Sequence, residues 1–121
     1  MAEITERQLL AQLRESVELL AAPAADQEGW LAGERVPVDE LALQLEDAVP
    51  YWFPRLTGAQ LLSGEAQRML VELLDALGDF GGPANAALWT EEALCSADEW
   101  RHVRDLAQRA LAELRSGSPS T

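Results

Sequence analysis

The chain has 121 residues, of which 21 are acidic and 9 are basic, so its formal net charge is −12 at pH 7. This charge excludes nucleic acid and anionic membranes as direct partners and favours a basic protein partner. The chain contains no run of about 18 apolar residues, the length that a membrane-spanning helix needs. The single cysteine, Cys95, excludes an intrachain disulfide, and the acidic N-terminus does not resemble a signal peptide, so we expect a cytoplasmic protein.

The first predicted helix has a marked start and one continuous apolar face. Thr5 and Gln8 have the spacing of a capping box, in which the threonine oxygen accepts a hydrogen bond from an unpaired backbone N–H. The apolar side chains that follow recur at helical spacing: Leu9, Leu10, Leu13, Val17 and Leu20. Pro23 ends this helix or opens the next turn, and a shorter helix is expected over residues 24–34, around Trp30.

The middle of the chain has an irregular pattern. A helix that begins at Val38 or Asp39 is expected to end at Pro50. Because Pro50 and Pro54 are only four residues apart, we predict a break in the helix rather than a continuous one. Three consecutive aromatic residues lie between these prolines: Tyr51, Trp52 and Phe53.

Residues 57–83 are expected to form a turn, a strong helix and a glycine-rich exit. Thr57 and Gln60 have the spacing of a second capping box and predict the turn. Ser63 is expected to cap a helix that continues to about Leu77. Its apolar face consists of leucines and one methionine: Met69, Leu70, Leu73, Leu74 and Leu77.

The C-terminal part predicts a short helix followed by a long one. Thr90 is expected to open a helix of one to two turns that reaches Cys95. Ser96 and Glu99 have the spacing of a third capping box. The long helix that follows turns these residues inward: Trp100, Val103, Ala107, Ala110, Leu111 and Leu114.

The predicted fold class is all-α, an irregular bundle of three longer and two or three short helices. We expect a single helical domain over residues 1–115 and a disordered C-terminal tail over residues 116–121. Trp89 and Trp100 flank the short helix near residue 90 and are expected to pack on each other or on the core.

The candidate catalytic and metal-binding residues do not assemble into a reactive constellation. His102, the only histidine, follows Glu99 at the Glu-x-x-His spacing of di-iron bundles, but that chemistry needs two such motifs and two further glutamates. Cys95 has acidic neighbours, which disfavour a reactive thiolate, and we expect it to be half-buried and structural. We therefore expect no catalytic residue, no metal, no cofactor and no enzymatic activity.

Negative charge and aromatic residues coincide in the middle of the chain. Residues 26–54 carry seven acidic residues and one arginine. Aromatic anchors are typical of protein–protein interfaces, although large aromatics also fill cores. We predict that the partner-binding face is formed by these residues: Asp39, Glu40, Glu46, Asp47, Tyr51, Trp52 and Phe53.

Two segments of the C-terminal third carry a resemblance to a known class of proteins. They read Leu88-Trp89-Thr90-Glu91-Glu92-Ala93-Leu94 and Glu99-Trp100-Arg101-His102-Val103-Arg104, followed by Leu106-Ala107. They are similar to small acidic all-α immunity proteins of bacterial polymorphic toxin systems. The resemblance implies a cytoplasmic, non-catalytic protein whose partner is a cognate toxin.

The sequence leaves other functions open beside an inhibitor. A helical adaptor or secretion chaperone would form a dimer with a large exposed apolar groove. An inhibitor would act as a monomer, which is the state we expect, and its acidic surface would be steered to a basic cleft. An enzyme would need a convergent polar site that this sequence does not assemble.

Overall fold

The computed structural model describes residues 5–47 and 49–116, and for residues 49–52 and 116 it describes the backbone alone. This part of the chain consists of helices joined by short connections. Among these residues no strand occurs, and the predicted all-α class is confirmed. The three long helices are α1 (Glu6–Ala21), α5 (Gly64–Asp79) and α7 (Asp98–Ser116). The shorter elements are α2 (Ala24–Glu34), α3 (Asp39–Glu46), α4 (Val49–Gly58), the 3₁₀ helix η1 (Pro83–Leu88) and α6 (Glu91–Ser96).

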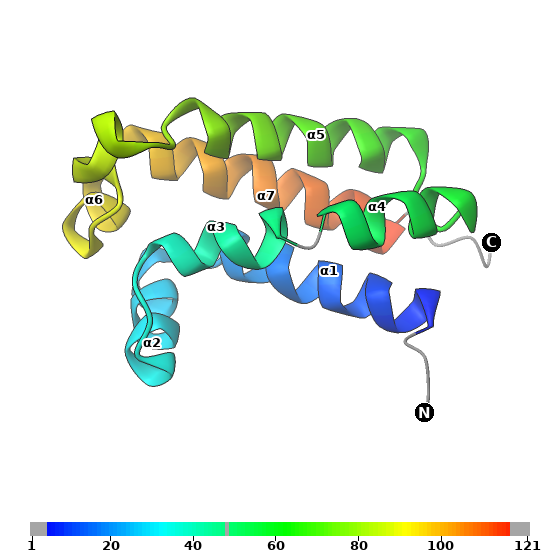
Figure 1. The fold of residues 1–121 in the computed structure, drawn as a ribbon, viewed down its shortest axis with the longest axis horizontal. Coiled ribbons are helices and arrows are strands. Elements are labelled where there is room, and N and C mark those ends of the chain that lie inside the picture. The colour runs from blue at the N-terminus through cyan, green and yellow to red at the C-terminus, as the bar shows by residue number, and fades with distance from the viewer. Residues whose placement is uncertain (1–4, 48, 117–121) are drawn as a thin grey trace.

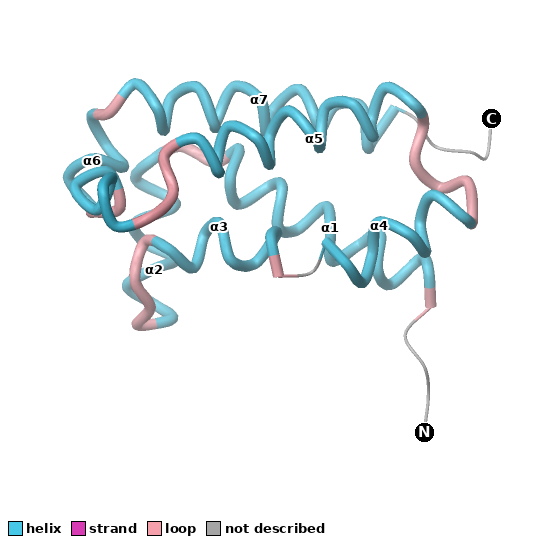
Figure 2. The backbone as a smooth tube through the Cα atoms, turned by 45° about the horizontal axis from the view of Figure 1, so that its top comes forward, coloured by secondary structure: helices cyan, strands magenta, loops and turns pink. Residues whose placement is uncertain are grey.

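The long helix α7 lies at the centre of the bundle. It packs against α1 on one side and against α5 on the other, and it runs antiparallel to both (Figure 1). Helices α3 and α4 pack against α1. Helices α2 and α6 touch each other at the end of the bundle away from the start of α1 and the end of α7 (Figures 1 and 2).

The core consists of the apolar stripes that these helices turn toward one another. The largest fully buried side chains come from seven elements or their connections: Leu13, Leu20, Leu31, Leu41, Leu45, Leu56, Leu70, Leu73, Leu77, Leu94 and Trp100. Full burial of a leucine side chain contributes about 1.5–3 kcal/mol. The predicted inward faces of the first and last helices are confirmed, since every member of them except the half-buried Leu10 is buried.

Three of the predicted helix starts are confirmed by their hydrogen bonds, one of them at Thr90, whose Oγ1 accepts from the Ala93 N–H at 3.1 Å. Thr5 Oγ1 accepts from the Gln8 N–H at 3.1 Å, and Gln8 Oε1 accepts from the Thr5 N–H at 2.7 Å, which completes the capping box. Ser63 Oγ accepts from the Ala66 N–H at 3.0 Å. Such caps hold their helices because they satisfy N–H groups that have no partner within the helix.

The break predicted between Pro50 and Pro54 is wrong, because residues 49–58 form α4. Pro50 is the second residue of that helix, where the backbone N–H has no intrahelical partner to lose. Pro54 removes one interior hydrogen bond, and the burial of Leu56 together with packing on α1 outweighs that loss. Thr57 therefore lies inside α4 rather than at a cap, and its hydroxyl donates to the Phe53 carbonyl at 2.8 Å.

The capping box predicted at Ser96 and Glu99 is also wrong. Ser96 is the last residue of α6, and its hydroxyl donates to the Glu92 carbonyl at 2.9 Å. A serine hydroxyl at a helix end has this alternative partner, the carbonyl one turn back. The chain turns at Ala97, which has extended backbone, and α7 begins at Asp98.

A buried glutamine joins the helices at the α2–α6 end. The Gln27 side chain has no exposed surface, and its Nε2 donates to the Leu19 and Leu20 carbonyls at 3.0 and 3.1 Å. Its Oε1 accepts from Arg104 Nε at 3.2 Å, and Arg104 also donates to the Leu94 carbonyl. Gln27 thus satisfies carbonyls at the end of α1 and ties α2 to α7.

Candidate partner-binding site

A hollow of about 510 Å³ lies between α3 and the segment that follows α5. Figure 1 shows that α3 and the segment after α5 both lie toward the end of the bundle that holds α2 and α6. The residues that line it are Asp39, Ala42, Leu43, Glu46, Gly81, Gly82, Pro83, Ala86 and Trp89. We call it the α3 hollow. Its volume falls within the range of pockets that hold small molecules or single side chains.

One wall of the α3 hollow is a stripe along α3. Asp39, Ala42, Leu43 and Glu46 follow the i, i+3, i+4, i+7 spacing that places side chains on one helical face. The stripe is acidic at both ends and apolar between them, and Leu43 is 39% exposed. Partial burial and then the neighbouring Asp47 raise the pKa of the Glu46 carboxyl.

The other wall is formed by a glycine pair and one face of η1. Gly82 has φ 89°, a conformation that residues with a Cβ rarely adopt, and it directs the chain into η1. The helix η1 is kinked at Asn85, with Pro83 before the kink, Ala86 after it and Trp89 directly after the helix. These are the three residues of this segment, beside the glycines, that line the α3 hollow.

Trp89 is held firmly in this wall. Its indole N–H donates to the Phe80 carbonyl at 2.7 Å. Its ring centroid lies 5.2 Å from that of Phe80 and 5.3 Å from that of Trp100, the latter edge to face. Trp100 is fully buried and donates to the Leu88 carbonyl at 2.6 Å. The predicted contact between the two tryptophans is confirmed, and it gives the α3 hollow a preorganised aromatic wall.

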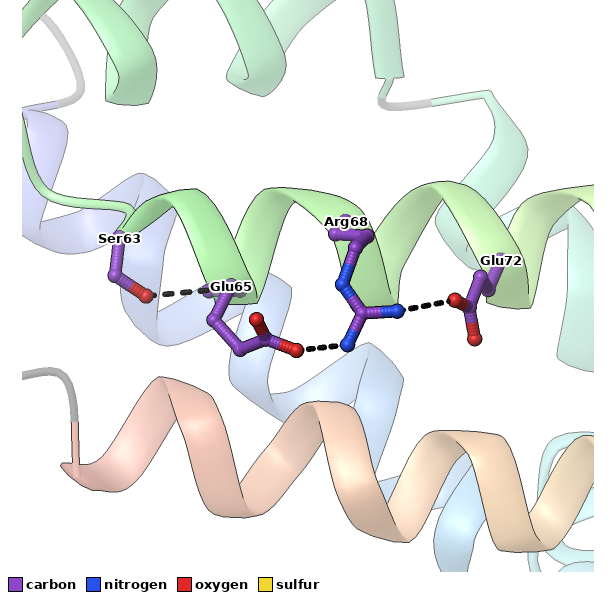
Figure 3. Close-up of polar contacts among 5 residues, drawn as sticks. Ser63, Glu65, Arg68 and Glu72 are labelled. Atoms are coloured by element: carbon purple, nitrogen blue, oxygen red, sulfur yellow. Dashed lines mark hydrogen bonds and ion pairs between the residues drawn. The ribbon is translucent and has the colours of Figure 1, made fainter.

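Ion pairs of the described residues lie within single helices or join two helices. On α5, Arg68 lies between Glu65 and Glu72, with Nη1 2.6 Å from the Glu72 carboxylate (Figure 3). The further ion pairs are Glu6–Arg55, Glu18–Arg115, Asp98–Arg101 and Asp105–Arg109. In residues 5–47 and 49–116, no ion pair includes an acidic residue of the 39–47 segment.

The structure brings two of the predicted partner-binding residues into the α3 hollow, Asp39 and Glu46. Glu40 is half-buried and Asp47 is exposed, and both lie on α3 or at its end outside the lining. Phe53 is half-buried on α4 and packs against the core. The side chains of Tyr51 and Trp52 lie outside the described residues.

Sequence reasoning assigned Trp89 to packing and missed its second role in the lining. The spacing of three from Pro83 to Ala86 to Trp89, directly after two glycines, is the pattern that marks this wall. The spacing alone does not place these residues on one wall, because η1 is kinked at Asn85. Which α-helical face lies opposite it depends on contacts between segments that are far apart in the sequence.

The two residues considered for catalysis are both exposed. His102 lies on the outer face of α7. The half-buried position predicted for Cys95 is wrong, because Cys95 is exposed near the end of the short helix α6. Its thiol donates to the Glu28 carboxylate. That hydrogen bond is the main cause of a raised pKa of Cys95, which disfavours the nucleophilic thiolate. No group of three or more potential metal ligands occurs within the described part of the chain.

No family model, curated protein or solved structure matches the chain. Among the helices described, none combines the length and apolar character that crossing a membrane requires.

Proposed function

We propose that this chain is a non-enzymatic, acidic protein-binding domain of the cytoplasm that neutralises a basic partner, in the manner of an immunity protein that blocks the basic surface or active-site cleft of a toxin. The observation that carries this proposal is the α3 hollow. There, carboxylates that form no ion pair within the described residues stand beside a fixed tryptophan.

The charge distribution supports a basic partner. Residues 36–54 contain four acidic residues and no basic one. On the long helices, by contrast, some acidic residues have an arginine partner, for example Glu18, Glu65 and Asp105. Such a one-sided patch raises the association rate with a positively charged protein and disfavours partners of like charge. Its negative potential is available to a partner because it is not neutralised within the bundle.

The apolar surface supports an inhibitor over a chaperone. Among the described side chains, the large apolar ones that are exposed are Leu43 on α3 and Val71 on α5. A chaperone that holds a partly unfolded client needs a broad apolar groove. A small aromatic and aliphatic centre with a charged rim is instead typical of a specific interface.

The test co-expresses the tagged chain with the products of its neighbouring genes and measures the stoichiometry of any complex by native mass spectrometry. Association with the recovered partner is then followed by stopped-flow kinetics over a range of salt. We expect the double variant Asp39→Asn/Glu46→Gln to associate about tenfold more slowly at low salt, with a flatter salt dependence.

A matched control separates the effect of where the charge lies from the effect of net charge. Glu15→Gln/Asp75→Asn removes the same charge from exposed positions on α1 and α5 and should leave the association rate near that of the unmodified chain. Equal slowing by both variants would show that net charge alone matters. A stable homodimer that binds many unfolded clients would favour the adaptor or secretion chaperone instead.

A further inference from the structure

The α3 hollow has a chemical pattern more specific than negative charge. We propose that it receives an arginine side chain of the partner, with the guanidinium paired to Asp39 or Glu46 and its plane against the Trp89 indole. This inference rests on the proposed function, because it names the group by which a basic partner protein would enter the site.

The spacing of the carboxylates fits an extended organic cation. Asp39 and Glu46 are two helical turns apart, which is about 10 Å along the axis of α3. A single metal ion binds oxygen ligands at about 2.0–2.6 Å and would not be shared across that span. A side chain that enters at one carboxylate and passes along Ala42 and Leu43 places its stem on apolar surface and its charge at an acid.

The opposite wall favours a planar cation over a compact one. A guanidinium is planar, is weakly hydrated, stacks on aromatic faces and forms paired hydrogen bonds with a carboxylate. A lysine ammonium is strongly hydrated and makes no such planar contact. Trp89 is fixed by its hydrogen bond to Phe80 and by its ring contacts, so the aromatic wall needs no rearrangement when a ligand enters.

The volume of the α3 hollow fits this occupant. About 510 Å³ is room for a whole side chain with some water. Among the lining residues there is no basic side chain, so an incoming cation meets no repulsion there. The neighbouring carboxylate of Asp47 adds to the local negative charge without lining the α3 hollow.

The experiment titrates the full chain with three blocked tripeptides, Gly-Arg-Gly, Gly-Lys-Gly and Gly-citrulline-Gly, and follows the indole N–H of Trp89 and the amides of Gly81 and Gly82 by NMR. We expect a saturable shift with the arginine peptide, binding about fivefold weaker with the lysine peptide, and none with citrulline, which keeps the shape and lacks the charge.

Two matched variants locate the binding. Ala86→Leu fills the α3 hollow from the face of η1 that lines it, whereas Ala87→Leu adds the same side chain to an exposed position outside the lining. Ala86→Leu should abolish the shifts, and Ala87→Leu should retain them. Circular dichroism checks that both variants fold.

Three outcomes would overturn the inference: equal shifts with citrulline, shifts that survive Ala86→Leu, or no shift at tens of millimolar arginine peptide. The partner complex separates this failure from failure of the proposed function. If Asp39→Asn/Glu46→Gln weakens the partner complex while the arginine peptide does not bind, the proposed function is supported and the arginine contact is wrong. If the peptide binds and no basic partner is found, the arginine contact is supported and the proposed function is wrong.

Discussion

The long-helix core and the α3 hollow use similar residues in opposite ways. Along α1, α5 and α7, several acidic side chains pair with arginines, and the buried Gln27 of α2 is hydrogen-bonded through both the oxygen and the nitrogen of its amide. At the α3 hollow, carboxylates and a leucine face solvent beside an aromatic ring. We therefore expect the paired groups and Gln27 to stabilise the bundle and the groups of the α3 hollow to be available for a partner. The predictions that follow test this contrast.

The largest effect is expected at Trp100, where the two regions meet. Trp100→Ala should lower the free energy of unfolding by about 3–5 kcal/mol, because it removes a fully buried ring and leaves the Leu88 carbonyl without its donor. Chemical denaturation measures this loss. A loss below about 1 kcal/mol would contradict the central position given to this residue in the core.

A smaller loss is expected at Gln27. Gln27→Leu should cost about 2–3 kcal/mol, because the Leu19 and Leu20 carbonyls and the Arg104 guanidinium would lose a buried partner. The control is Gln108→Leu, which removes an exposed side chain that donates to the Ala21 carbonyl at 3.2 Å and should cost under about 1 kcal/mol. Equal losses would show that burial of the amide does not matter.

The smallest effect is expected in the α3 hollow and has the opposite sign. Folding raises the pKa of Glu46 above its ordinary value of 4.5, so its charged form is less favourable in the folded chain than in the unfolded chain. Glu46→Gln should therefore raise stability at pH 7 by ~0.3 kcal/mol. This gain should disappear as the pH falls below 4.5, where the carboxyl is protonated in both states.

Thermal and urea unfolding at pH 7 and at acidic pH measure this dependence. A loss of stability at pH 7 would show that the Glu46 carboxylate has a stabilising partner in the fold. That result would move Glu46 from the group available for binding to the group that holds the bundle together.

The local features of the fold could be predicted from the sequence. The caps at Thr5 and Ser63 depend on side chains three residues from their partners, and the buried stripes of the first and last helices depend on spacing within one helix. These interactions are complete within a short segment. The pattern of residue types is therefore sufficient to predict them.

The predictions that were wrong concern residues whose local sequence allows two alternative structures. Ser96 and Thr57 each have a hydroxyl that could cap a following helix, and each instead donates to a carbonyl one turn back. Pro54 lies inside a helix because tertiary packing outweighs one lost hydrogen bond. Local spacing does not rank such alternatives.

The candidate site was half predictable. The acidic residues of α3 and their lack of nearby basic residues are visible in the sequence. The wall that faces them is contributed by residues 81–89, which are about as far from α3 in sequence as α3 is from the start of the chain. Trp89 enters the site because the bundle brings these two segments together.

Trp89 has a consequence for how binding and folding are connected. Its ring lines the α3 hollow and also contacts Trp100, the largest fully buried residue of the core. The α3 hollow exists only in the folded chain, so a molecule that occupies it shifts the folding equilibrium by mass action. A partner bound there would therefore also stabilise the fold, and we expect the chain to resist unfolding and proteolysis most while the α3 hollow is occupied.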